Sequence, residues 1–130
     1  MDTWVYKQRT GELWDPKGVT VAHGYAGGDC GKRPDGVNNP ALENVPCVGP
    51  LPAGVYEIGT PRDSAHLGPF AIPLMPRIGT ETFGRSGFFI HGDKVGGPPQ
   101  SASEGCIILP RAIRELIAVS LVKTLTVVKG

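Results

Sequence analysis

The sequence predicts a small, mainly β domain of the sandwich or barrel type, with one C-terminal helix and long loops rich in glycine and proline. Glycine and proline together make up about a quarter of the 130 residues, and they divide the chain into short segments. The segments between these breakers are apolar and rich in β-branched and aromatic residues, as strands are. Hardly any stretch before Pro110 is long enough for a helix, which excludes a helical bundle or a coiled coil.

Length and charge limit the chain to one domain, residues 1–130, with no evident nucleic-acid or membrane partner. A hydrophobic share of 40% is enough for a compact core. Thirteen basic and twelve acidic residues leave a net charge of +1, which is too small to attract nucleic acid or anionic lipid. There is no membrane-spanning apolar run, and the first residues lack the basic and apolar regions of a secretory signal. A monomer is expected, since no self-complementary apolar patch is evident.

The first half of the chain predicts three strands followed by a long loop. Residues 4–8 alternate in polarity, and a Thr10-Gly11 turn separates them from residues 12–14, which predicts a hairpin. Residues 19–22 form a third β-prone segment. From residue 26 to residue 52 the chain consists mostly of breakers, and loops of this length in small domains are usually functional or mobile. One short helical turn is expected at residues 40–45, after an Asn cap.

The second half predicts more strands and the single helix. Strands are expected at residues 54–58, 70–74, 87–91, 106–109 and 124–128. A glycine-rich loop covers residues 92–103. The helix begins at Pro110, which suits a first-turn position. Its apolar stripe is formed by Ile113, Leu116, Ile117 and Leu121.

The candidate chemistry lies where two of these strands meet the glycine-rich loop. His91 ends one apolar strand and Cys106 begins the next, so a base and a soft nucleophile are expected at the same edge of the sheet. A thiol attacks carbonyl groups as the thiolate, and a neighbouring imidazole commonly generates it. Gly105 leaves room for a substrate carbonyl and frees backbone N–H groups for the oxyanion. Taken singly, each residue is more often structural: a buried cysteine, or a hydrogen-bonded surface histidine.

Together these residues resemble the signature of L,D-transpeptidase (YkuD-like) domains. That signature is a His-Gly pair, His91-Gly92 here, a loop of comparable length, and a Ser/Thr-x-Gly-Cys box, here residues 103–106. The rest of the chain resembles the subgroup found as type VI secretion L,D-transpeptidase effectors. The segments that carry this resemblance are residues 4–13, 23–25, 38–40, 49–56 and 84–88.

The resemblance implies a peptidoglycan enzyme that needs no metal or organic cofactor. Its substrate would be the bond between meso-diaminopimelate and D-alanine in tetrapeptide stems. Cys106 would be the nucleophile and His91 the acid–base residue. The N–H groups of Gly105 and Cys106 would bind the oxyanion, and Ser103 would shape the turn or bond the substrate, beside Gly92. Water would then give L,D-carboxypeptidase activity, and an amine would give exchange or cross-linking.

Two positions depart from the broader family. Glu104 stands where the box usually carries histidine, and Ile108 stands where arginine is frequent. Arg85 could supply the missing positive charge and hold a substrate carboxylate. The alternative for Arg85 is a solvated arginine at a strand end.

The resemblance also implies a biological setting. An antibacterial effector would be made in the cytoplasm without a signal peptide, and would act in the periplasm of a target cell. Its partners would be the stem peptides, a cognate immunity protein that covers the cleft, and a spike or tube component of the secretion apparatus. Two other functions remain open: a stem-binding module without turnover, and a Cys-His amidase that cuts another bond of the stem.

The remaining candidate residues have weaker patterns. His23 and His66 could orient His91 or contact the substrate, but surface or hairpin roles are expected for both. A metal site made by the three histidines with cysteine is not expected, because no pair has the close spacing of zinc ligands. Asp93 could orient His91, but a backbone carbonyl is the expected partner. A bridge between Cys30 and Cys47 would contribute roughly 3 kcal/mol. Two reduced thiols are an equally good interpretation, because the sequence does not give their separation.

Overall fold

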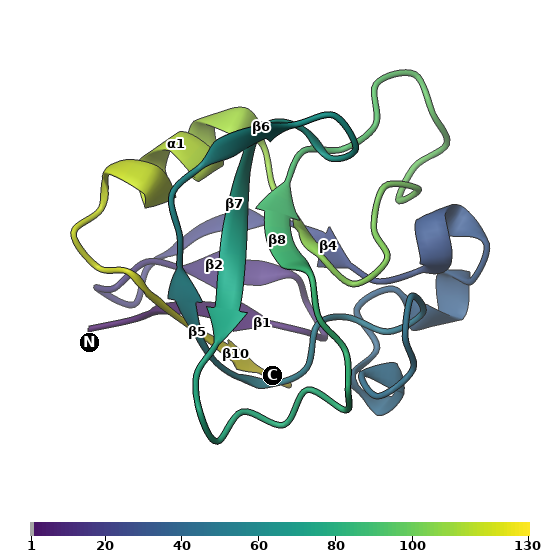
Figure 1. The fold of residues 1–130 in the computed structure, drawn as a ribbon, viewed down its shortest axis with the longest axis horizontal. Helices are drawn as coiled ribbons and strands as arrows, with labels where there is room; N and C mark the ends of the chain where they lie inside the picture. Colours follow the sequence, from purple (N-terminus) through teal and green to yellow (C-terminus); the bar gives the residue numbers. More distant parts are fainter. Residues whose placement is uncertain (1) are drawn as a thin grey trace.

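The computed structural model describes residues 2–130 and confirms a mainly β fold with one α-helix (Figure 1). Its strands are β1 (Trp4–Lys7), β2 (Glu12–Trp14), β3 (Thr20–His23), β4 (Tyr25–Ala26), β5 (Gly54–Ile58), β6 (Arg62–Ser64), β7 (Gly68–Pro76), β8 (Phe88–His91), β9 (Ile107–Ile108) and β10 (Thr124–Val128). The helix α1 spans Arg111–Val119, and three short 3-10 helices cover Asp29–Gly31, Pro34–Gly36 and Pro40–Leu42.

The strands form one mixed sheet that curls until its two ends approach each other. Its order is β3-β2-β1-β10-β5-β7-β8-β9-β4, with β6 added beside β7. Strands β3 and β4 stand at opposite ends of this order, yet only Gly24 separates them in the chain. Gly24 has no room for a side chain, because a Cβ there would overlap the Ile108 carbonyl of β9. The single-residue link therefore brings the last strand close to the first, as in a barrel.

The first and last strands are partners in the middle of the sheet. Strand β1 pairs with β10 in parallel, with Trp4 opposite Leu125 and Tyr6 opposite Val127. All four of these side chains are buried in the core. The predicted alternation of residues 4–8 is therefore confirmed, because its even-numbered positions face inward.

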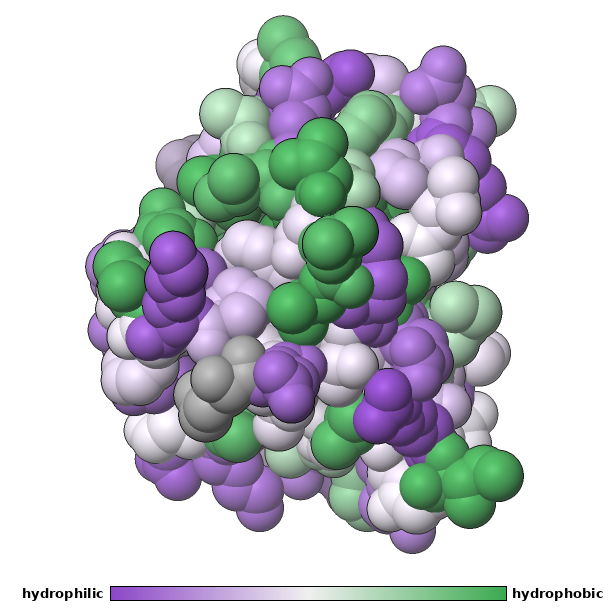
Figure 2. Space-filling model, turned by 90° about the vertical axis from the view of Figure 1, so that its left-hand side faces the viewer, coloured by the Kyte–Doolittle hydropathy of each residue, from purple (hydrophilic) through white to green (hydrophobic). Residues whose placement is uncertain are grey.

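Helix α1 differs from the prediction in the residues that it buries. Ile117 and part of Ile113 pack against the core, as predicted. Leu116 is largely exposed, and Leu121 lies beyond the helix end at Ser120 and is almost fully exposed. The buried face includes Arg114 instead, a position that its charge would assign to solvent. Figure 2 shows the side of the molecule that carries α1, where hydrophobic groups alternate with hydrophilic ones.

The sequence did not predict the strands β4 and β6. Strand β4 has two residues between glycines, too few for any periodicity. Strand β6 consists of polar residues and forms by pairing with β7, which itself runs from Gly68 to Pro76 rather than from residue 70 to residue 74. The turn after Asn39 is confirmed as a 3-10 helix, with the Asn39 side chain accepting from the Ala41 N–H. Within residues 2–130, no helix has the length and apolar character that crossing a bilayer requires.

Candidate active site

Two parallel strands bring Cys106 and His91 to one face of the sheet. Strand β8 pairs with β9, with Ile90 opposite Ile107 and His91 opposite Ile108. This register places Cys106, one residue before β9, opposite Phe89. Since alternate residues of a strand share a face, Cys106 lies on the face that carries both Phe89 and His91.

Cys106 lies where two hollows meet. A hollow of about 160 Å³ is lined by both Cys106 and His91. A larger hollow of about 480 Å³ extends from Cys106 along residues 84–89. His66 and Leu67, from the turn between β6 and β7, line both hollows, as does Glu104. The nucleophile candidate therefore has one space on the side of the imidazole and a second, larger space on the other side.

The surroundings keep both candidate groups neutral near pH 7. Burial raises the pKa of the Cys106 thiol to about 11, although the Phe89 N–H and the Arg85 charge partly oppose this. Burial also lowers the pKa of His91, and the hydrogen bond to the Gly92 carbonyl partly opposes this. The resting pair is therefore a thiol and a neutral imidazole, and the thiolate must form by proton transfer as the sulfur attacks.

A backbone carbonyl orients His91, as the sequence predicted. The Nδ1 atom of His91 lies 3.0 Å from the Gly92 carbonyl oxygen, which favours the tautomer with its proton on Nδ1 and leaves Nε2 as the acceptor. Asp93 instead accepts a 2.7 Å hydrogen bond from the Tyr25 hydroxyl. A Cβ at Gly92 would lie 2.8 Å from Nη2 of Arg114, so a glycine fits here for steric reasons. A role of Gly92 in substrate binding stays a prediction.

Ser103 shapes the turn before Cys106. Its buried hydroxyl donates to the Cys106 carbonyl over 2.6 Å. The same oxygen accepts from the N–H of Gly27 at 2.8 Å and from that of Gly105 at 3.0 Å. Because the Gly105 N–H is engaged in this way, the Cys106 N–H is the better oxyanion donor of the predicted pair.

Arg85 holds two loops together at the edge of the larger hollow. Its Nη1 donates to the carbonyls of Glu43 and Pro50 at 2.6 and 2.8 Å. Its Nη2 donates to the carbonyls of Gly49 and Glu104 at 3.1 and 3.3 Å. This corrects the interpretation of Arg85 as a solvated strand-end residue. A substrate carboxylate would have to compete with four carbonyl groups for the guanidinium.

Gly105 is packed against Arg85 rather than open to a substrate. Its φ of +128° lies in a region that favours glycine, and a Cβ would overlap Nη2 of Arg85. The sequence interpretation gave the substrate carbonyl as the reason for this glycine. In the structure, the Arg85 guanidinium already requires a glycine at this position.

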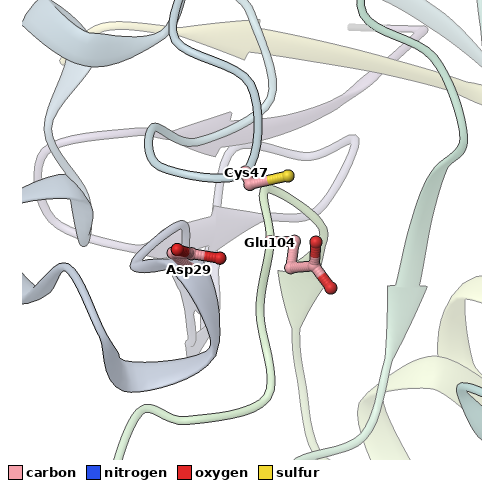
Figure 3. A group of neighbouring side chains, drawn as sticks. All are labelled: Asp29, Cys47 and Glu104. Atoms are coloured by element: carbon pink, nitrogen blue, oxygen red, sulfur yellow. The ribbon is translucent and has the colours of Figure 1, made fainter.

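A group of possible metal ligands lies beside the nucleophile. Asp29, Cys47 and Glu104 place one ligand atom each within 4.8 Å of one another, and each comes from a separate segment (Figure 3). The Cys30 sulfur also approaches Glu104, at 3.6 Å. Such a mixture of thiol and carboxylate ligands suits Zn²⁺. The sequence analysis considered a metal site only for histidines with cysteine and missed this group, because its members lie far apart in the chain.

All three cysteines are free thiols, so the structure contains no bridge between Cys30 and Cys47. Glu104 raises the pKa of both thiols, together with burial, which is the larger cause for Cys30 and the second for Cys47. Of the weaker histidine candidates, His66 faces the site, and His23 at the end of β3 lines a different pocket.

Comparison with known proteins finds a match to one protein family. A protein-family model described as the Tlde1 domain matches residues 21–129. No curated protein and no solved structure gives a match to the chain. The matched range includes every strand from β4 to β10 and both candidate catalytic residues.

Proposed function

The chain belongs to the Tlde1 domain family, a family of type VI secretion effectors, and from this premise we propose that it is a cysteine enzyme acting on peptidoglycan. The bond attacked would be the amide between meso-diaminopimelate and D-alanine in a tetrapeptide stem. One observation carries the proposal: Cys106 and His91 share one face of the β8–β9 pair and one hollow.

The first half of the reaction forms a thioester. Nε2 of His91 takes the Cys106 proton while the sulfur attacks the diaminopimelyl carbonyl carbon. The oxygen of the tetrahedral intermediate becomes negative and accepts from the Cys106 N–H. The C–N bond then breaks, and the proton on His91 passes to the departing D-alanine amine.

The second half resolves the thioester. His91 takes a proton from an incoming water or amine, which attacks the thioester carbonyl carbon. The C–S bond then breaks, and the proton on His91 returns to the Cys106 sulfur. Water gives a tripeptide stem and thus L,D-carboxypeptidase activity. A D-amino acid or the amine of a second stem gives exchange or a cross-link. Neutral resting groups suit this role, because a neutral imidazole can accept a proton at each attack.

The two departures from the broader L,D-transpeptidase pattern have different surroundings. Ile108 is a buried apolar residue opposite Tyr25 of β4, and it supplies no charge near the sulfur. Glu104 is exposed at the rim of both hollows and carries a negative charge beside the nucleophile. The chain therefore depends on Arg85, whose charge favours the Cys106 thiolate, for the positive group near the sulfur.

The proposed setting is the periplasm of a rival cell, reached by injection. A cognate immunity protein would protect the producer by covering the two hollows at Cys106. The effector would also contact a spike or tube component during delivery.

The decisive experiment is incubation of purified tetrapeptide muropeptides with the wild type, Cys106→Ala and His91→Gln, followed by mass spectrometry. We expect the wild type to remove one alanine, and both variants to lose at least about 100-fold in rate. Binding of the muropeptides without any mass change would instead support a stem-binding module without enzymatic activity. Cleavage at another bond that still depends on Cys106 would indicate a Cys-His amidase. Ser101→Ala, a buried serine outside the proposed site, is a control for indirect effects of substitution.

A further inference from the structure

A second pocket of about 480 Å³ lies next to the catalytic histidine but does not include Cys106. We refer to it as the arginine pocket, because Arg111 and Arg114 line it. The other polar side chains of its lining are His23, Tyr25, Asp93 and Gln100. Gly92 lines both the arginine pocket and the smaller hollow at Cys106, so the two spaces share a wall.

Arg114 is a buried cation without a counter-charge. Its exposed fraction is 6%, yet it forms no ion pair with any carboxylate of residues 2–130. Nε donates to the Leu109 carbonyl at 3.1 Å, and Nη1 donates to those of Pro69 and Phe70, both at 2.9 Å. A buried charge of this kind is costly unless an anion compensates it.

The remaining Nη2 of Arg114 is free to meet a ligand. Among the residues that the structure describes, it has no hydrogen-bond acceptor, and it lies beside Gly92 at the pocket wall. Carbonyl groups hold the other two nitrogens of the guanidinium, so Nη2 is already fixed in direction. A cationic donor that is fixed in direction gives strong charge-assisted hydrogen bonds.

The other charges around the pocket also favour an anion. Arg111 stands at the rim and forms an exposed ion pair with Glu115 at 3.2 Å. His23 adds a titratable base. Asp93 is the one acidic residue in the lining, and its Oδ1 accepts from the Tyr25 hydroxyl and from the Lys94 N–H.

We propose that the arginine pocket binds a carboxylate, with Nη2 of Arg114 as its central donor. Ile108, Leu109 and Pro110 add an apolar wall, which suits a carboxylate on an amino acid or a peptide end better than a bare inorganic anion. The site is separate from the thioester chemistry of Cys106, and its existence does not depend on the proposed function.

Binding of such a ligand would change the pKa of His91. The positive charge of Arg114 lowers the pKa of His91, as does His66, whereas Asp93 raises it. A carboxylate on Arg114 neutralises part of that charge, so the pKa of His91 should rise when the pocket fills. Occupancy would then leave less neutral imidazole at a given pH.

The test is a nuclear magnetic resonance titration of the whole chain with N-acetyl-D-alanine and with acetate, against sodium chloride of equal ionic strength. We expect saturable shifts at the Gly92 and Asp93 amides and an upward shift of the His91 titration. Tighter binding of N-acetyl-D-alanine than of acetate would assign a peptide end, and equal binding would assign small carboxylates in general. Shifts no larger than those with chloride would overturn the proposal.

Variants separate binding from folding. Arg114→Lys keeps the charge but loses the fixed Nη2 donor, and should weaken binding by about tenfold. Arg111→Gln changes only an exposed residue and should weaken binding by about threefold. Glu115→Gln is its matched control, because it frees Arg111 and should not weaken binding. Unchanged affinity in a folded Arg114→Lys protein would overturn the assignment, whether or not Cys106 is catalytic.

Discussion

One buried hydroxyl, that of Ser103, fixes the backbone on both sides of Cys106. It satisfies two N–H donors and one carbonyl acceptor, in segments far apart in the chain. Removing it leaves three backbone groups without a partner in a place that water does not reach.

Ser103→Ala should therefore lower the free energy of unfolding by about 3 kcal/mol and reduce activity as well. Ser101→Ala is the matched control, because the buried Ser101 hydroxyl donates one hydrogen bond, to the Pro98 carbonyl, and its loss should cost about 1 kcal/mol. Urea denaturation of both variants measures the difference. Equal losses would show that the Ser103 bonds contribute little.

The charge state of the nucleophile gives a second prediction at this scale. Because the pKa of Cys106 is raised to about 11, its alkylation by iodoacetamide should accelerate steadily from neutral to alkaline pH. The exposed Cys47 should react faster than Cys106 at neutral pH. Peptide mass spectrometry after timed alkylation follows each thiol. A plateau in the Cys106 rate near neutral pH would instead indicate a preformed thiolate–imidazolium pair.

At the scale of elements, the turn from Ser103 to Cys106 depends on a glycine that touches Arg85. Gly105→Ala should lower the free energy of unfolding by about 3 kcal/mol, because it adds both an unfavourable φ and an overlap with the guanidinium. Gly84→Ala is the control, with a positive φ but open space around it, and should cost about 1 kcal/mol. Thermal unfolding compares the two, and similar losses would remove Arg85 from the explanation.

Elements with a strong local pattern could be predicted, and those made by pairing could not. The hairpin of β1 and β2 and the start of α1 follow from a glycine turn, from alternation and from Pro110. Strands β4 and β6 carry no such pattern and exist because β9 and β7 offer hydrogen bonds. Leu121 fitted the helical spacing but lies after the helix end, since periodicity alone does not mark where a helix stops.

At the scale of the whole molecule, the candidate site also combines residues that a local sequence pattern predicts with residues that only the fold brings together. Cys106 and His91 could be proposed from sequence, because each adjoins an apolar strand and a glycine-rich loop joins them. The role of Arg85 and the arginine pocket could not, because both depend on backbone carbonyls from distant segments. The group around Glu104 likewise assembles three separate loops.

The number of free thiols is a prediction about the whole chain. Alkylation of the unfolded, non-reduced protein should add three adducts, because Cys30 and Cys47 are unbridged and Cys106 is the third. The intact mass gives the count directly. One adduct would mean that Cys30 and Cys47 are joined and would contradict the structure.

The parallel pairing of β1 with β10 also sets the order of events during synthesis. Trp4 pairs with Leu125, so the domain cannot complete its core before β10 has been synthesised. Contacts so distant along the chain slow folding, because a long loop must close before they stabilise anything. The nascent chain must therefore avoid aggregation until β10 is available to pair with β1.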